Sequence, residues 1–160
     1  MSKKLVAYFS ATNVTAEVAN TLAEAAGADL YEIKAEVPYT TEDINWRDNQ
    51  SRSYAEYKDS SIRPAITGKD ANINEYDVIF LGFPIWWHVA PLIINTFLES
   101  YDFSNKIVVP FATSGSEGFG NTLDALTPSA SINTIWKDGK MLNGNPSKEI
   151  LTVWIDNLNL

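Results

Sequence analysis

The sequence predicts an α/β fold in which one parallel sheet is covered by helices on both faces. Short, almost continuously apolar runs alternate with amphipathic segments along the chain. Such runs are typical of strands that are buried on both faces of a sheet. With 160 residues, of which 45% are hydrophobic and 20% charged, the chain can bury the core of one domain. We therefore expect a single domain over residues 1–160.

The first part of the chain alternates strand and helix patterns. An apolar run at residues 5–9 predicts the first strand, and residues 30–33 predict the second. Between them, apolar residues recur at every fourth position from Val14 to Ala26. This period predicts a helix that ends at Gly27.

The remainder of the chain predicts three more strands and four more helices in alternation. Residues 35–70 are polar and lack a clear period, and we expect a helix within about residues 42–58. Pro91 is well placed to begin a helix, since proline is favoured in the first turn. The predicted strands are residues 76–81, 106–111 and 132–136, and the predicted helices are residues 91–97, 122–126 and 146–158.

Composition and charge narrow the range of functions. The chain has no cysteine, which excludes disulfides, thiolate metal sites, iron–sulfur clusters and a cysteine nucleophile. Its net charge is −8, and its only basic cluster is Lys3-Lys4, which argues against nucleic acid as a partner. The acidic surface either steers a basic partner toward the protein or only aids solubility.

Two segments bear on membrane insertion and targeting. The most apolar stretch, residues 78–94, is short and contains glycine, proline and histidine, so we expect no membrane insertion. The amino terminus enters the first strand pattern directly and lacks the long apolar core of a signal peptide. We expect a soluble, cytoplasmic protein, and the sequence leaves monomer and homodimer both open.

The first of three unusual loops joins the first strand to the first helix. Ligands of parallel sheets bind beyond the carboxyl ends of the strands, where this loop is expected to lie. The amides of a helix start favour an anion, and hydroxyls add donors without adding charge. An ordinary helix cap, made by Ser10 or Thr12, is the alternative. The candidate residues are Ser10, Thr12, Asn13, Val14 and Thr15.

The second loop carries two adjacent tryptophans between two prolines. Neighbouring side chains of a regular strand face opposite sides, so both indoles cannot enter the core together. Beyond the strand end, they offer a face for a planar aromatic ligand. The alternative is that one tryptophan caps the core and the other packs on a neighbouring helix. The candidate residues are Pro84, Ile85, Trp86, Trp87 and His88.

The third loop is rich in glycine and serine. Glycine lets a backbone approach a flat ligand closely, and the small hydroxyls offer donors. Gly115 and Gly120 have the spacing of an ATPase phosphate loop, but Asn121 stands where that motif requires lysine, which excludes an ATPase. A mobile surface loop is the alternative. The candidate residues are Thr113, Ser114, Gly115, Ser116 and Gly118.

Together these loops resemble those of the flavodoxin family, and the resemblance covers essentially the whole chain. Residues 10–15 are similar to the family's phosphate loop, and residues 84–87 and 113–118 are similar to the loops that enclose the isoalloxazine ring. The chain most resembles a bacterial subgroup with a Pro-Ile-Trp-Trp loop and a long insertion, here residues 35–70. The resemblance implies a flavodoxin-like three-layer sandwich, a five-stranded parallel sheet in the order 2-1-3-4-5, and FMN as the cofactor.

The same resemblance implies a role for individual residues. Ser10, Thr12 and Thr15 would bind the phosphate, the two tryptophans would lie beside the ring, and the later loops would supply backbone donors. Asn13 departs from the family pattern, which commonly has glycine there. Asparagine tolerates a positive φ better than other non-glycine residues, so we expect the turn to survive.

The leading functional hypothesis is a flavoprotein of electron transport that exchanges electrons with redox partner proteins or small-molecule acceptors. The alternative is an oxidoreductase, an NAD(P)H-dependent FMN quinone or nitro reductase. Its nicotinamide site would use the arginines and tyrosines of residues 35–70. A phosphorelay receiver lacks its acidic residues after the first and third strands, and a hydrolase lacks its serine elbow. A metal site would have only scattered carboxylates and the single histidine, His88.

Overall fold

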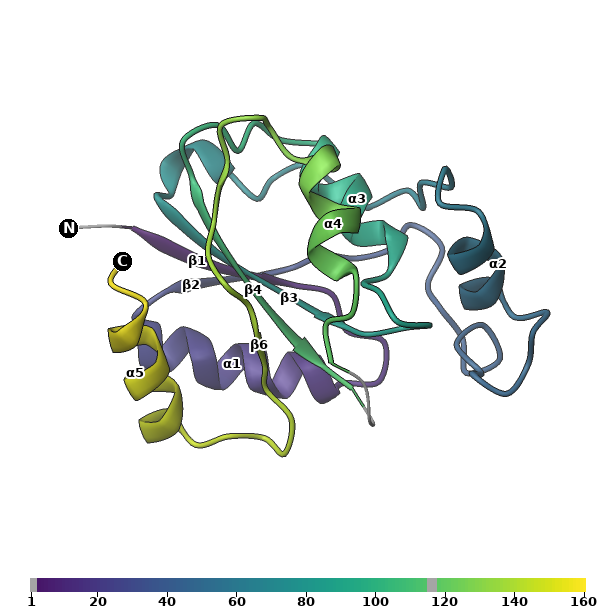
Figure 1. Ribbon diagram of the computed structural model, residues 1–160, viewed down its shortest axis with the longest axis horizontal. Coiled ribbons are helices and arrows are strands. Elements are labelled where there is room, and N and C mark those ends of the chain that lie inside the picture. The colour runs from purple at the N-terminus through teal and green to yellow at the C-terminus, as the bar shows by residue number, and fades with distance from the viewer. Residues whose placement is uncertain (1–2, 115–117) are drawn as a thin grey trace.

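The computed structural model describes residues 3–114 and 118–160 (Figure 1). None of the helices in these two ranges is long and apolar enough to cross a membrane. The strands are β1 (Lys4–Tyr8), β2 (Asp29–Glu32), β3 (Val78–Pro84), β4 (Ile107–Thr113), β5 (Ile135–Trp136) and β6 (Lys140–Met141). The helices are α1 (Val14–Ala26), α2 (Arg52–Lys58), α3 (Leu92–Glu99), α4 (Thr122–Leu126) and α5 (Lys148–Asn157), with 3-10 turns η1 (Ile73–Glu75) and η2 (Thr127–Ser129).

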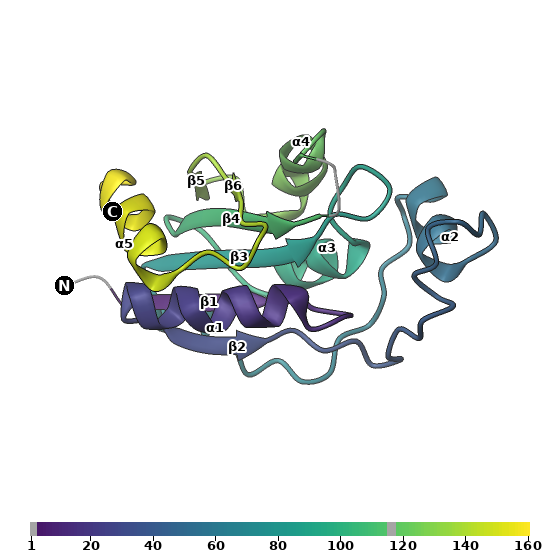
Figure 2. The same ribbon diagram turned by 90° about the horizontal axis from the view of Figure 1, so that it is seen from below.

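The architecture is a three-layer sandwich with a parallel sheet in the middle. The strand order is β2-β1-β3-β4-β5, which confirms the predicted fold class and strand order. Helices α1 and α5 pack on one face of the sheet, and α3 and α4 pack on the other (Figures 1 and 2). Helix α2 stands apart from both layers, beyond the carboxyl ends of the strands.

The core depends on strands that have no solvent-facing side. Strands β3 and β4 are buried almost throughout, as their continuous apolar runs predict. Helix α1 contributes Val18 and Leu22 to the core, and α5 contributes Leu151. Helix α1 ends as predicted, because Gly27 has a φ of 62° and its N–H bonds back to the last turn.

The edge of the sheet beyond β4 differs from the prediction. One strand was expected at residues 132–136, whereas two short strands, β5 and β6, both pair with β4. The carbonyls of Val108 and Ala112 accept hydrogen bonds from this edge, so Pro110, between them, faces it too. Proline has no N–H to donate, and the pairing is interrupted there. A Cβ on Gly139 would lie 2.9 Å from the Pro110 carbonyl oxygen, so glycine permits the close passage.

The helix predicted at about residues 42–58 is shorter in the structure. Helix α2 begins only after Ser51, whose hydroxyl accepts a hydrogen bond from the N–H of Tyr54. Before it, the side chains of Asn45 and Asp48 accept hydrogen bonds from main-chain N–H groups two residues further on. Such local bonds hold the backbone in turns and compete with helix formation.

Candidate functional site

The three candidate loops meet at the carboxyl edge of the sheet. The hydroxyls of Thr15 and Thr113 lie 2.8 Å apart, and these residues are only 2% and 4% exposed. This hydrogen bond joins the first loop to the third across 98 positions of sequence. The N–H of Ile85 donates to the Thr113 carbonyl at 2.9 Å, which joins the second loop to the third. A Cβ on Gly120 would lie 2.7 Å from the His88 carbonyl oxygen, so the last two loops also touch there.

The first loop presents the start of α1 at this edge. Asn13 has a φ of 71°, as its tolerance of positive φ led us to expect, and its side chain makes no capping hydrogen bond. The Ser10 hydroxyl accepts a bond from the N–H of Ala16 at 3.2 Å, so it serves as a cap, while Thr12 is exposed. The first amides of a helix have no acceptor within the helix. The loop is therefore chemically suited to a small anion.

The second loop is a tight turn with an unusual backbone. The N–H groups of Trp86 and Val89 each donate to the carbonyl of the other, at 2.9 and 3.3 Å. The two residues between them, Trp87 and His88, have φ values of 52° and 77°. A turn with two positive φ values normally uses asparagine and glycine. Left-handed backbone at each of these bulky residues costs about 1–3 kcal/mol, which the surrounding contacts must offset.

The two tryptophans pack on different parts of the protein. The ring centroids of Trp86 and Tyr39 are 5.0 Å apart, and Trp86 packs against the larger core cluster. Trp87 instead donates its Nε1–H to the Ser53 hydroxyl at 3.0 Å and packs edge-on against Tyr54 of α2. This is the arrangement described above as the alternative, with one indole on the core and the other on a neighbouring helix.

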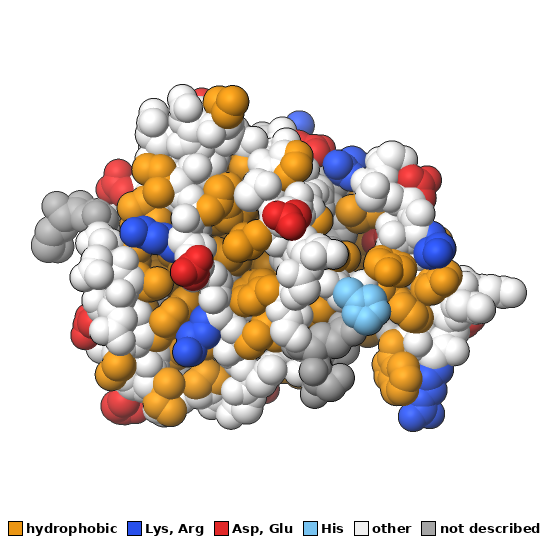
Figure 3. All heavy atoms as spheres, in the orientation of Figure 1, with side chains coloured by type: hydrophobic (Ala, Val, Ile, Leu, Met, Phe, Trp, Pro, Cys, Tyr) orange, Lys and Arg blue, Asp and Glu red, His pale blue; other side chains and the backbone are white. Residues whose placement is uncertain are grey.

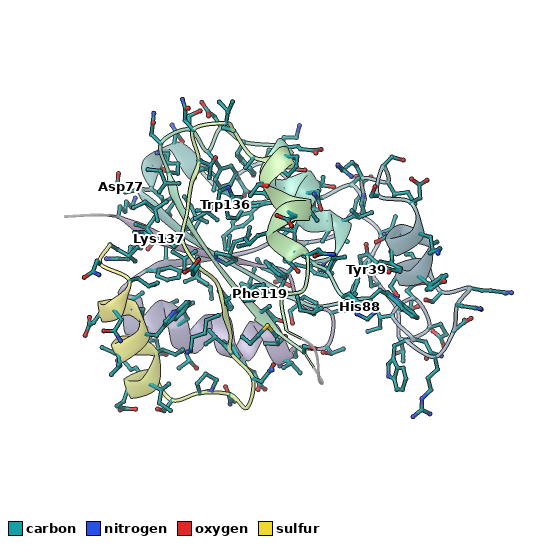
Figure 4. The ribbon with its side chains drawn as sticks, in the orientation of Figure 1. Tyr39, Asp77, His88, Phe119, Trp136 and Lys137 are labelled. Carbon is teal, nitrogen blue, oxygen red and sulfur yellow. The ribbon has the colours of Figure 1, made fainter. Side chains whose placement is uncertain are left out.

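His88 lies at the surface next to α2. Figure 3 shows it exposed, with hydrophobic side chains beside it, and its ring centroid is 6.2 Å from that of Tyr57. In Figure 4, Phe119 lies toward the middle of the molecule, and His88 and Tyr39 lie on the side of α2. The second loop therefore contacts the third loop through the His88 carbonyl and α2 through the rings of Trp87 and His88.

The third loop is described only at its two ends. The N–H of Ser114 donates to Asn143 Oδ1 at 2.8 Å, which ties the loop to the segment after β6. A Cβ on Gly118 would meet nothing within 4 Å. Gly115 and Ser116 lie outside the described residues. Sequence reasoning missed Asn143, because its partner is far away in the sequence and no local motif marks it.

A buried ion pair lies behind the second loop. Glu56 is 6% exposed, and its carboxylate accepts hydrogen bonds from the Tyr39 hydroxyl at 2.8 Å and from Arg52 Nε at 3.2 Å. Burial raises the pKa of Glu56, and the hydrogen bonds from Tyr39 and the charge of Arg52 oppose that rise. Burial and the neighbouring Glu56 also raise the pKa of Tyr39. The guanidinium carbon of Arg52 lies 3.7 Å from the Tyr39 ring centroid. The i,i+4 spacing of Arg52 and Glu56 is a helical ion-pair pattern, but nothing in the sequence marks Tyr39 as the third member of the cluster.

Comparisons with known proteins agree with this architecture. A family model described as flavodoxin matches residues 3–158. A candidate flavoprotein from Bacteroides eggerthii is 46% identical, with a TM-score of 0.93 over 100% of this chain and 99% of that chain. A candidate flavoprotein from Bacteroides uniformis is 48% identical, with a TM-score of 0.90 over 97% and 98%.

More distant structures share the fold alone. A flavoprotein in complex with FMN from Lactobacillus acidophilus is 17% identical, with a TM-score of 0.72 over 100% of both chains. A comparison with curated proteins gives no match.

The Thr15–Thr113 hydrogen bond should stabilise the fold measurably. Replacing either threonine alone by valine leaves one buried hydroxyl unpaired, so we expect each change to lower the free energy of unfolding by about 1–3 kcal/mol. The double variant should lose less than the sum of the two single losses. Urea unfolding of the four proteins measures this coupling, with Thr21→Val on α1 as a control for the substitution itself. Strictly additive losses would show that the two hydroxyls do not depend on each other.

Proposed function

The chain belongs to the flavodoxin family, and we propose that it binds FMN at the carboxyl edge of its sheet and transfers electrons through it. The convergence of the three loops carries this proposal. It brings a helix start that suits an anion next to one loop rich in aromatic side chains and one rich in glycine and serine. Bound FMN would supply the reversible uptake of electrons, and the protein would supply binding and geometry. The FMN complex of the Lactobacillus acidophilus flavoprotein supports the choice of cofactor.

The first loop fits a phosphate group by its donors. No basic residue lies between Lys4 and Lys34, so the loop would bind the phosphate through N–H groups and hydroxyls. Thr12 is exposed and can donate its hydroxyl. The Thr15 hydroxyl is already paired with Thr113, so we assign Thr15 mainly its main-chain N–H and a positioning role.

The second and third loops would enclose the flavin ring. We propose that residues 84–88 lie on one side of it and that Thr113, Ser114 and Gly118 lie on the other. Trp87 holds the second loop in place through its contacts with α2. The Pro-Ile-Trp-Trp sequence supports placing the chain in the bacterial subgroup with that loop.

Two of the three arginines of residues 35–70 are already paired with carboxylates, which favours an electron carrier over an NAD(P)H-dependent reductase. The third, Arg47, stacks on the Trp46 ring. Arg52 is bonded to Glu56, and Arg63 Nε lies 2.9 Å from a Glu99 carboxylate oxygen. Both guanidinium groups therefore already neutralise carboxylates of this chain. A nucleotide phosphate would have to compete with those carboxylates, which weakens the case for a nicotinamide nucleotide site in this segment.

The purified protein should be yellow, or become yellow when FMN is added, and should release FMN on denaturation. The reason is that the site offers one uncharged phosphate cradle. Chromatography of the released cofactor against FMN and FAD standards measures the outcome. Release of FAD, or no flavin binding at all, would refute the proposed function.

Replacing Thr12 by alanine should weaken binding of FMN much more than binding of riboflavin, which has no phosphate. A lost hydrogen bond to a charged acceptor costs about 1.5–3 kcal/mol, or about 10- to 150-fold in the dissociation constant. Flavin fluorescence titrations of both ligands give the two constants. Thr21→Ala, which removes a hydroxyl from helix α1 away from the loop, is the matched control. An equal loss of affinity for FMN and riboflavin would show that Thr12 does not bind the phosphate.

A carrier should not accept hydride directly from a nicotinamide nucleotide. On stopped-flow mixing of the FMN-loaded protein with NADH or NADPH, the flavin absorbance should stay unchanged over many seconds. Dithionite, added in parallel, should bleach it and show that the flavin is reducible. Rapid bleaching by either nucleotide would refute the electron-carrier hypothesis and support the NAD(P)H-dependent reductase.

A further inference from the structure

The segment after β6 contains the one asparagine of the chain that a glycine follows, Asn143 before Gly144. Both residues are exposed and lie outside the helices and strands. Gly144 has a φ of 77°, and a Cβ there would meet nothing within 4 Å, so the space around this residue is open. No side chain at position 144 therefore hinders an approach of its main-chain nitrogen to the Asn143 side chain.

The side-chain amide of Asn143 is polarised by its contact with the third loop. Its Oδ1 accepts a hydrogen bond from the N–H of Ser114 at 2.8 Å. A donor on this oxygen stabilises the negative charge that the oxygen gains when a nucleophile attacks Cγ. The hydrogen bond that ties the third loop to this segment therefore also activates the amide.

We propose that Asn143 is a site of spontaneous deamidation, which places a negative charge beside the third loop. The main-chain nitrogen of Gly144 gives up its proton and bonds to Cγ of Asn143, and the Cγ–Nδ2 bond breaks as ammonia leaves. Water then opens the cyclic imide at one of its two carbonyls, which leaves an aspartate or an isoaspartate at this position. The reaction needs only water, and it is independent of the proposed binding of FMN.

Both products change the contact between this segment and the third loop. An aspartate keeps an oxygen that accepts the Ser114 N–H and makes this hydrogen bond charge-assisted. An isoaspartate adds one methylene to the main chain, which moves its carboxylate away from the position of the original amide. The surroundings of the Ser114 N–H therefore differ from those of the unmodified protein in either product.

The test incubates the purified protein for several days at mildly alkaline pH and maps its peptides by mass spectrometry. The gain of about 1 Da that marks deamidation should appear first at Asn143. Asn145, two residues on, should stay unchanged, because Pro146 follows it and has no N–H to lose. Asn133 is also exposed, but the β-branched Thr134 crowds the attacking nitrogen, so its conversion should be about tenfold slower. No conversion of Asn143, or equal conversion of Asn133, would overturn the proposal.

Gly144→Ala tests whether the open main-chain nitrogen drives the reaction. The added methyl group hinders the attack, so deamidation of Asn143 should slow by about tenfold. Gly27→Ala is the matched control, because Gly27 also has a positive φ and open space around it but follows an alanine. Circular dichroism checks that both variants fold, and the comparison with Asn133 in the unaltered chain needs neither. An unchanged rate in folded Gly144→Ala would refute the mechanism.

Asn143→Asp supplies one product directly and tests whether the charge reaches the third loop. The N–H resonance of Ser114 in amide NMR spectra should shift in this variant, because its acceptor becomes charged. Asn133→Asp adds the same charge before β5, near the opposite end of β4, and should leave the Ser114 resonance in place. An unmoved Ser114 resonance in Asn143→Asp would refute the effect on the third loop, whether or not FMN binds as proposed.

Discussion

Burial of β3 and β4 on both faces fixes the positions from which loops leave the carboxyl edge of the sheet. A strand with no solvent-facing side cannot shift its register without moving apolar side chains across the core. The loops that leave these strands therefore start from fixed points. The Thr15–Thr113 hydrogen bond adds a direct link between two of them, and it is itself buried. The loops themselves contain little regular secondary structure. The packing of the sheet is therefore what holds the residues of the candidate site in place.

The strained turn of the second loop depends on α2. Trp87 holds a left-handed backbone that bulky residues avoid, and its indole is fixed by a hydrogen bond and an aromatic contact to α2. Helix α2 has only seven residues, which is too short to be stable alone in water. The helix and the turn thus stabilise each other. The long segment before β3 contributes to the candidate site by holding the turn in its unusual shape.

The sequence was informative where local rules decide the structure and silent where distant residues meet. Helix α1 and its end at Gly27 could be predicted, because period and backbone conformation are local properties. The split edge of the sheet could not, because it depends on how Pro110 faces β5 and β6. The Thr15–Thr113 bond and the Glu56–Tyr39 bond join residues with no shared local pattern. The residue types of the loops could therefore be interpreted from the sequence, whereas the long-range contacts that fix the loops could not be predicted from it.

Trp86 ties the second loop to the core of the protein. Its indole packs on Phe9 and Tyr39 at the end of the core. Its main chain is fixed by the paired hydrogen bonds to Val89. A side chain held by two aromatic neighbours and a closed turn cannot swing away without breaking several contacts at once. The position of the second loop at the sheet edge is therefore fixed by the packing of Trp86 as well as by the strand from which the loop leaves.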